Sequence, residues 1–212
     1  LRSDDTLVAW GSNFFQQCNV PSLPQGVRYV DISTGWNHNL ALRSDGQVIA
    51  WGDTTDGKCK VPRLWPGVSY VDVSASLYHS LALRSDGVLE FWGKESILHY
   101  NFPSLEPGIK YTQVVAGQYN DLAIRSDGKL AFWDNGGAGY PPSDTAGFTQ
   151  AGCGRRHYVA LTTDGFVRVW GDTTVGRGSV PVLQPGSRYA QIAAGANHTL
   201  ALVVEVDSLA SN

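Results

Sequence analysis

The chain has 212 residues, of which 42% are hydrophobic and 17% are charged, so it has enough apolar surface to bury a core of ordinary size. Its net charge of −3 is spread over both signs, and no apolar run approaches the ~20 residues of a membrane helix. We therefore expect neither nucleic acid as a partner nor insertion into a membrane. The 24 glycines and 10 prolines, with short runs of β-branched and aromatic residues, favour an all-β chain with many turns.

One pattern recurs five times along the chain. It is cut short at the start, in LRSDDTLVAWG, and follows as NLALRSDGQVIAWG (39–52), SLALRSDGVLEFWG (80–93), DLAIRSDGKLAFWD (121–134) and VALTTDGFVRVWG (159–171). A tryptophan marks the same point of each copy, at Trp10, Trp51, Trp92, Trp133 and Trp170, with spacings of 41, 41, 41 and 37 residues. A period of about 40 residues with four short β-runs in each copy is typical of a β-propeller blade.

Each full copy predicts four strands in a fixed order. The first strands begin at residues 29, 70, 111, 148 and 189, as in YVDIS, and a short loop leads to second strands such as HNLAL. An Asp-Gly pair then predicts a type I′ hairpin turn, which needs positive φ values. The third strand ends on the tryptophan, and the fourth ends at a proline, as in NVP, KVP, NFP and SVP.

The two ends of the chain complement each other, because residues 189–206 supply the first two strands of a blade and residues 6–21 supply the last two. We expect one propeller domain over residues 1–212, with five four-stranded blades at 29–62, 70–103, 111–141, 148–181 and the two ends joined. Such closure would leave no unpaired strand edge. We also expect the chain to be a piece of a longer polypeptide, because it starts inside a motif and lacks methionine. The alternative to closure is an open array with further repeats outside it, because an open register would produce the same ends.

The consensus AG-x-x-H-(T/S/N)-L-A-L-R-S-D-G-x-V-x-A-W-G, followed by VP and PG-x-x-Y, resembles the regulator-of-chromosome-condensation repeat family over nearly the whole chain. The resemblance implies a β-propeller that binds other proteins. Members of this family include a nucleotide exchange factor for a small GTPase on chromatin, propeller domains attached to ligases and kinases, and a propeller-type β-lactamase inhibitory protein. Members commonly have seven blades, so five would be a departure.

The residues that the copies share are expected to be structural. Four of the five histidines, His38, His79, His157 and His198, occupy one position, with Asn120 in the remaining copy. Equivalent positions on neighbouring blades lie too far apart to share a zinc ion, whose nitrogen ligands lie at ~2.1 Å, and an asparagine in one copy fits a hydrogen-bonding role. The five repeated tryptophans lie in alternating apolar strands and are expected to pack between blades.

No motif in the sequence indicates catalysis. The chain contains no G-x-S-x-G, H-E-x-x-H, P-loop or Cys-x-x-Cys pattern. We therefore expect a protein that is not an enzyme and that uses no cofactor and no metal ion.

A partner is expected to bind where the copies differ. In a four-stranded antiparallel blade, the loop after the first strand and the loop after the third emerge on one face, opposite the uniform Asp-Gly turns. These loops hold aromatic residues and arginines, which are typical of protein-binding hot spots. The candidate partner-binding residues are Phe14, Phe15, Trp36, Asn37, Leu77, Tyr78, Gln118, Tyr119, Arg155 and Arg156. The alternative is that several of them, above all the phenylalanines, fold inward and cover the ring.

Two further features lie on the same face. The loop after Trp133 is short and glycine-rich, which predicts a notch beside Arg155 and Arg156 that suits a carboxylate group from a partner. Asn197-His198-Thr199 matches an N-glycosylation sequon, but the repeat already explains the histidine and the threonine, so coincidence is the favoured interpretation.

Three functions remain open, and the sequence leaves the compartment undetermined. The leading hypothesis is a protein-binding propeller that acts as an interaction module, an inhibitor or an assembly subunit. A lectin-like, carbohydrate-binding propeller is the first alternative, because aromatic faces stack on sugars, although the loops share little beyond Asp-Thr-Thr in two copies. A regulator similar to a guanine-nucleotide exchange factor is the second.

Overall fold

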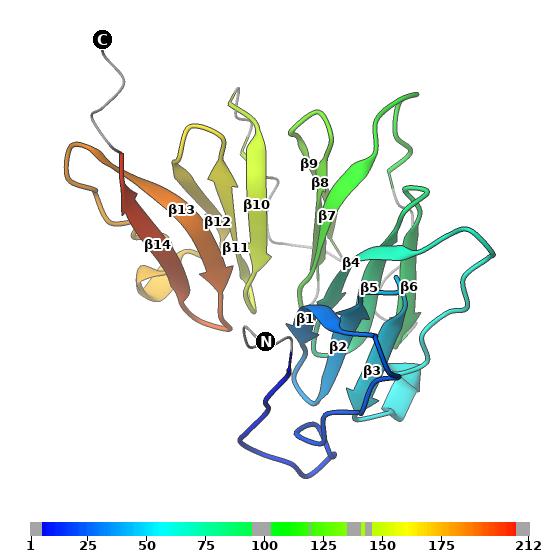
Figure 1. The fold of residues 1–212 in the computed structure, drawn as a ribbon. Coiled ribbons are helices and arrows are strands. Elements are labelled where there is room, and N and C mark those ends of the chain that lie inside the picture. Colours follow the sequence, from blue (N-terminus) through cyan, green and yellow to red (C-terminus); the bar gives the residue numbers. More distant parts are fainter. Residues whose placement is uncertain (1–5, 95–102, 119, 135–140, 143–145, 207–212) are drawn as a thin grey trace. The chain divides into compact units, whose positions relative to one another are not determined.

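The protein is all-β, as the sequence predicts. The computed structural model describes residues 6–94, 103–118, 120–134, 141–142 and 146–206. Regular structure in these residues consists of fourteen strands and two short 3₁₀ turns, η1 (Thr55–Gly57) and η3 (Thr174–Gly176) (Figure 1). Within the same residues, no helix has the length and apolar character to span a membrane.

The chain divides into two compact units, and the boundary falls inside the third repeat. The first unit comprises Leu1–Tyr100 and Lys110–Ala116, and the second comprises Asn101–Ile109 and Gly117–Asn212. The first unit contains two whole repeats and the first strand of the third, and the second unit contains the other strands of the third repeat and the repeats that follow.

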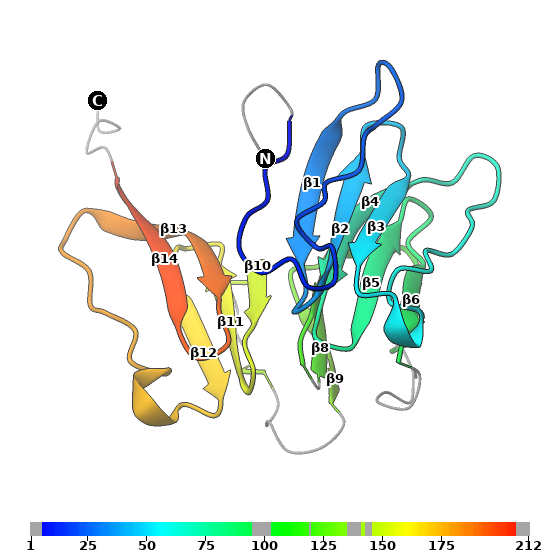
Figure 2. The ribbon, with the colours of Figure 1, turned by 90° about the horizontal axis from the view of Figure 1, so that it is seen from below.

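Three-stranded antiparallel sheets form the first unit (blue to green in Figures 1 and 2). One has the strand order β1 (Tyr29–Thr34), β2 (His38–Arg43) and β3 (Val48–Gly52). The next has the order β4 (Tyr70–Ala75), β5 (His79–Arg84) and β6 (Leu89–Gly93). Strand β7 (Tyr111–Ala116) opens the third repeat and packs against β4 and β5.

The second unit continues the same pattern (green to red in Figures 1 and 2). Strand β8 (Asn120–Arg125) pairs with β9 (Leu130–Asp134). A three-stranded sheet follows, with β10 (Phe148–Cys153), β11 (His157–Thr162) and β12 (Val167–Gly171). The last sheet has two strands only, β13 (Ser187–Ala194) and β14 (Thr199–Glu205).

The predicted fourth strands are not formed in the described residues. Residues 58–62, 177–181 and 6–21 contain no strand, and the expected fourth strands of the second and third repeats fall largely on residues 95–102 and 135–140, which lie outside the described part. The physical reason is that the backbone turns on itself there: the Lys60 N–H donates to the Gly57 carbonyl at 2.8 Å and the Val180 N–H to the Gly178 carbonyl at 3.0 Å, so these donors are not available to a sheet ladder. The segment is held by the next repeat instead, since the Tyr70 hydroxyl donates to the carbonyl of Pro62 at 3.0 Å.

The Asp-Gly turns also differ from the type I′ prediction. The Gly46 N–H donates to the Arg43 carbonyl at 2.9 Å, and only the glycine, with φ of +74°, lies in the left-handed region. Asp45 is therefore a central residue of an ordinary turn, and Gly46 follows it in the three-residue hairpin loop. The Arg43 guanidinium donates to the Asp45 carboxylate and fixes the turn. The sequence shows the Asp-Gly pair but not the loop length that decides the turn type.

The hydrophobic core repeats with the sequence. One cluster in the first unit consists of Leu40, Leu42, Tyr70, Val73, Ala75, Ala82 and Trp92. The Trp92 indole N–H donates to the Lys58 carbonyl at 2.7 Å, and the Trp51 indole N–H donates to the Gln17 carbonyl at 3.0 Å. Each tryptophan therefore joins its own repeat to the segment that follows the tryptophan of the preceding repeat. The second unit has a cluster of Val159, Leu161, Val167 and Tyr189 that uses the same repeat positions.

Candidate functional site

The repeated histidines form hydrogen bonds between neighbouring repeats. His38 and His157 are fully buried. His38 Nε2 lies 2.9 Å from Ser80 Oγ, and His157 Nε2 lies 3.1 Å from Thr199 Oγ1. Burial, followed by the nearby positive charge of Lys58, lowers the pKa of His38 to about 4, so this histidine is neutral at neutral pH.

The other two repeated histidines have different environments. His79 is also fully buried, with its Nδ1 2.9 Å from Ser76 Oγ, whereas His198 in the last repeat is exposed. Among the described residues, no three His, Cys, Asp or Glu side chains are grouped closely enough to hold a metal ion.

The repeated tryptophans have one exception. Trp51, Trp92 and Trp170 are 9%, 6% and 8% exposed, and Trp133 is half-buried. Trp10, in contrast, is 85% exposed, because residues 6–10 form no strand that would hold its indole against a neighbouring sheet.

Loops of two neighbouring repeats meet in the first unit and form what we call the aromatic loop cluster, made of Trp36, Asn37, Asp53, Lys58 and Tyr78. The Asp53 N–H donates to the Asn37 carbonyl at 2.7 Å, which joins the loop after the first strand to the loop after the third. Trp36 is 71% exposed, and Asn37 and Tyr78 are half-buried. The cluster therefore presents an exposed indole beside a loop that backbone hydrogen bonds hold in place.

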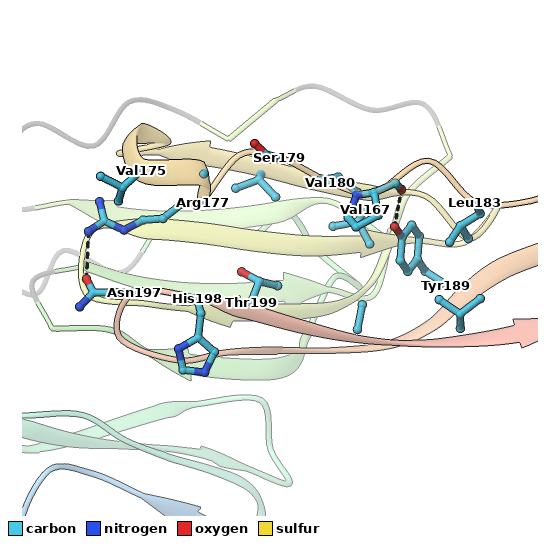
Figure 3. Close-up of a pocket in the computed structure, with 15 residues that line it drawn as sticks. Val167, Val175, Arg177, Ser179, Val180, Leu183, Tyr189, Asn197, His198 and Thr199 are labelled. Atoms are coloured by element: carbon cyan, nitrogen blue, oxygen red, sulfur yellow. Dashed lines mark hydrogen bonds between the residues drawn. The ribbon is translucent and has the colours of Figure 1, made fainter.

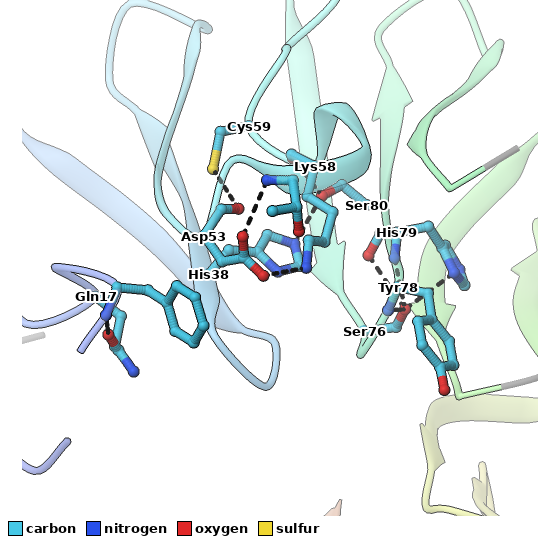
Figure 4. Close-up of polar contacts among 11 residues, drawn as sticks. Gln17, His38, Asp53, Lys58, Cys59, Ser76, Tyr78, His79 and Ser80 are labelled. Atoms are coloured by element: carbon cyan, nitrogen blue, oxygen red, sulfur yellow. Dashed lines mark hydrogen bonds and ion pairs between the residues drawn. The ribbon is translucent and has the colours of Figure 1, made fainter. Parts of the chain in front are cut away.

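Two members of this cluster, Asp53 and Lys58, form a buried ion pair (Figure 4). Lys58 Nζ lies 2.5 Å from Asp53 Oδ2, and the two side chains are only 7% and 8% exposed. Burial acts to raise the pKa of Asp53, but hydrogen bonds from Lys58 and from the Thr55 backbone outweigh it and lower this pKa to about 2. The neighbouring Cys59 thiol donates to the Asp53 carbonyl, and burial together with the Asp53 charge raises its pKa to about 11, so Cys59 is not an activated nucleophile.

The equivalent loops in the second unit form what we call the arginine loop cluster, made of Arg155, Arg156, Asp172, Arg177 and Asn197. These five residues line a pocket of about 240 Å³. The Asp172 N–H donates to the Arg156 carbonyl at 2.8 Å, and the Arg155 N–H donates to the Ala196 carbonyl at 3.0 Å. Loops of two successive repeats are thus joined here as they are in the first unit.

Arg177 contacts two other members of the arginine loop cluster, Asp172 and Asn197, and Figure 3 shows its bond to Asn197. Its Nη1 lies 2.6 Å from Asp172 Oδ2, and its Nη2 donates to Asn197 Oδ1 at 2.9 Å. Its Nε is buried and has no hydrogen-bond partner within the described part of the chain. Arg155 and Arg156 are exposed, and neither guanidinium forms an ion pair with a described residue.

The remaining candidates are spread over other loops. Phe14 is 85% exposed, and its ring lies 4.9 Å from that of the half-buried Phe15. Leu77 and Gln118 are half-buried, and Tyr119 lies outside the described residues. Asn197 is exposed, and its side chain accepts a hydrogen bond from Arg177; its glycosylation stays a prediction.

Sequence reasoning does not reveal the charged pairs that organise both clusters. From the sequence, Asp53 and Lys58 belong to a simple hairpin loop, and so do Asp172 and Arg177. A signal is nevertheless present, because DTTDGK and DTTVGR both place a cation five residues after an aspartate. In each loop a 3₁₀ turn brings the cation back to the carboxylate.

Comparison with protein families finds the regulator of chromosome condensation (RCC1) repeat at residues 29–58 and 148–177. Both matches run from a first strand to the end of the loop after the third, so each includes the charged pair described above. A comparison with curated proteins gives no match.

Several solved structures have a similar fold. Human WBSCR16 matches with a TM-score of 0.74 and 20% identity, covering 92% of this chain and 66% of that protein. Prp20p from Saccharomyces cerevisiae, a protein with binding properties to Gsp1p and histones, matches with a TM-score of 0.68 and 21% identity over 82% of this chain and 55% of that protein. The CRINKLY WD40 ectodomain of the Arabidopsis thaliana receptor kinase ACR4 matches with a TM-score of 0.67 and 20% identity, covering 92% and 67% of the two chains. The chain thus spans between about half and two thirds of these proteins, and at such identities the likeness concerns the fold.

Proposed function

We propose, from the premise that the chain is a propeller with RCC1-like repeats, that it is a non-enzymatic module that binds another protein through its variable loops. One observation carries the proposal. The positions that the repeats share are largely buried, whereas Trp36, Arg155 and Arg156, at two positions where the repeats differ, are exposed. The similar Prp20p is itself a protein that binds other proteins, Gsp1p and histones.

The loops are suited to this role because they are held in place before a partner arrives. Backbone hydrogen bonds tie Trp36 to Ser76, Asn37 to Asp53 and Arg155 to Ala196. Binding therefore costs little loop-ordering entropy, and an exposed indole and exposed guanidinium groups are the side chains that most often dominate binding energy.

Catalysis has little support from the cysteine and the histidine next to the aromatic loop cluster. The Cys59 thiol stays protonated because its pKa is about 11. His38 is buried, neutral and hydrogen-bonded to Ser80, so it is not available to a substrate. These are the properties of structural side chains.

The test is affinity capture from the native source with three versions of the chain. Trp36→Ala combined with Arg155→Ala and Arg156→Ala is expected to lose the partner that the wild-type chain retains. Trp65→Ala is the matched control, because Trp65 is also 71% exposed but belongs to neither cluster. Equal capture by all three folded chains, as judged by circular dichroism, would contradict the proposal; a glycan array and a GTPase release assay test the two alternative functions.

We further propose that the ring closes as a five-bladed propeller, with residues 7–11 as the third strand beside β14. Leu200 in β14 is 65% exposed, whereas Leu40 at the equivalent position of β2 is fully buried. A cavity of about 370 Å³ adjoins β14, lined in part by Val167, Val180 and Thr199 (Figure 3). In the first unit, Trp92 at the end of the third strand β6 belongs to the core cluster at the equivalent place. Trp10 is the corresponding tryptophan of the proposed closing blade, and its side chain is exposed.

The register of this closure follows from β2 and β3. Leu40 lies opposite Ala50 in that hairpin, so Ala9 is expected opposite Leu200. In a background with the native cysteines replaced by serine, Ala9→Cys with Leu200→Cys is expected to form a disulfide within one chain. Ala9→Cys with Ala201→Cys is the control, because adjacent residues of a strand point to opposite faces. Absence of the first cross-link, or equal formation of both, would refute the closure.

A further inference from the structure

The two loop clusters use the same positions of the repeat but differ in charge. The aromatic loop cluster contains one cation and one anion, whereas the arginine loop cluster contains three guanidinium groups and one carboxylate. The pairs of equivalent residues are Trp36 with Arg155, Asn37 with Arg156, Asp53 with Asp172, Lys58 with Arg177, and Tyr78 with Asn197. A neutral arrangement in the first unit thus becomes an arrangement with an excess of two positive charges in the second.

The carboxylate of the arginine loop cluster is already occupied. Asp172 Oδ1 accepts hydrogen bonds from the Thr174 N–H at 3.0 Å and from the Thr174 hydroxyl at 2.5 Å, and Asp172 Oδ2 is bound to Arg177. Donors remain on the other side, because the guanidinium groups of Arg155 and Arg156 are exposed and make no ion pair with described residues. A group that enters the pocket of about 240 Å³ therefore meets unsatisfied N–H donors and net positive charge.

We infer that the arginine loop cluster is a binding site for the carboxylate groups of an acidic segment in the partner protein. The inference rests on the proposed function and names the chemistry of the segment that binds there. Guanidinium forks match the two oxygens of a carboxylate, and hydrogen bonds between charged groups are about twice as strong as neutral ones. An extended polyphosphate chain fits less well, because the protein has a net charge of −3 and no basic stripe that would follow such a chain.

The experiment measures the anisotropy of three fluorescein-labelled peptides, in which four glutamates, four glutamines or four phosphoserines alternate with glycine. The glutamate peptide is expected to bind the wild-type chain, more weakly as salt rises, and the glutamine peptide is not. Arg155→Ala with Arg156→Ala is expected to raise the Kd of the glutamate peptide about tenfold or more. Arg63→Ala with Arg188→Ala removes the same charge from two other exposed positions and is expected to change the Kd less than about twofold.

Three results would overturn the inference: equal weakening by both double variants, equal binding of the glutamine peptide, or binding of the phosphoserine peptide alone, which would assign the pocket to phosphate. Failure of the inference is distinguishable from failure of the proposed function. If Trp36→Ala loses the native partner while the Arg155 and Arg156 variant keeps it, the protein-binding function stands and the carboxylate site does not.

Discussion

The buried pair between Asp53 and Lys58 offers a sharp test of how the loops are stabilised. Lys58→Met keeps the apolar stem of the lysine and removes its charge, and Asp53→Asn removes the charge of the partner. Both side chains are less than one tenth exposed, so either change leaves an unpaired charge out of water.

The expected costs differ because the two groups have different second partners. In Lys58→Met, the Asp53 carboxylate still accepts the Thr55 N–H at 2.9 Å, so the free energy of unfolding should fall by about 3 kcal/mol. In Asp53→Asn, the ammonium group keeps no other acceptor within the described part of the chain, and the fall should approach about 5 kcal/mol. The double variant removes both charges and should lose clearly less than the sum of the two.

Urea unfolding at pH 7, followed by tryptophan fluorescence, measures the three free energies. Arg177→Met is the control in the second unit, because its partner Asp172 is 29% exposed and the loss should stay below about 2 kcal/mol. Single variants that each lose less than about 1 kcal/mol, with additive effects in the double variant, would refute the view that this pair is desolvated. The pair should also persist to low pH, since the pKa of Asp53 is about 2 and its contribution, full above about pH 4, is lost as the pH falls through 2.

Three further predictions concern the blades. Burial, opposed by hydrogen bonds from the backbone, raises the pKa of Asp72 to about 6. Its contribution of about 3 kcal/mol to the free energy of unfolding is therefore present below pH 4 and lost as the pH rises through 6. The low pKa of His38, about 4, has the opposite effect, because its contribution is full above pH 6.5 and is lost as the pH falls towards 4. His38→Asn removes the opposing effect of the histidine, so the free energy of unfolding measured in urea should fall more steeply as the pH rises from 4 to 7. A pH profile equal to that of the wild-type chain would contradict this. Gly52→Ala should lower the free energy of unfolding by about 3 kcal/mol or more, because the φ of Gly52 is +106° and an added Cβ would lie 2.4 Å from a backbone oxygen. Gly57→Ala should lower it by about 1 kcal/mol in the same assay, because its φ is +77° but the atom nearest to an added Cβ lies at 4.0 Å. Tyr70→Phe removes a hydroxyl that donates to a proline carbonyl and should lower the thermal midpoint by a few degrees, equivalent to about 1 kcal/mol, as measured by calorimetry.

The positions of the strands could be predicted from the sequence because the repeat supplies several independent copies of one pattern. Alternation of apolar residues places β2 and β5, and the tryptophan marks the end of each third strand. The buried histidines could also be interpreted as hydrogen-bonding residues, since Asn120 replaces one of them.

The charged pairs and the fate of Trp10 could not be predicted in the same way. The pair between Asp172 and Arg177 depends on a 3₁₀ turn in which Val175 adopts φ of +53°, and no composition rule foretells a left-handed valine. The burial of a repeated tryptophan depends on the segment that covers it, so Trp10 shares the sequence of Trp51 but not its environment.

The outer edge of β14 has a consequence for how the protein behaves at different concentrations. An edge that accepts a strand from its own chain accepts the same strand from a neighbour, because the two contacts are chemically identical. Under the proposed closure, the tethered strand has an effective concentration of about 1 mM, so closed monomers would prevail in dilute solution. As the protein becomes more concentrated, exchange of this strand between molecules would link them head to tail into polymers, and the exposed leucine at position 200 would then be covered by another copy of the chain.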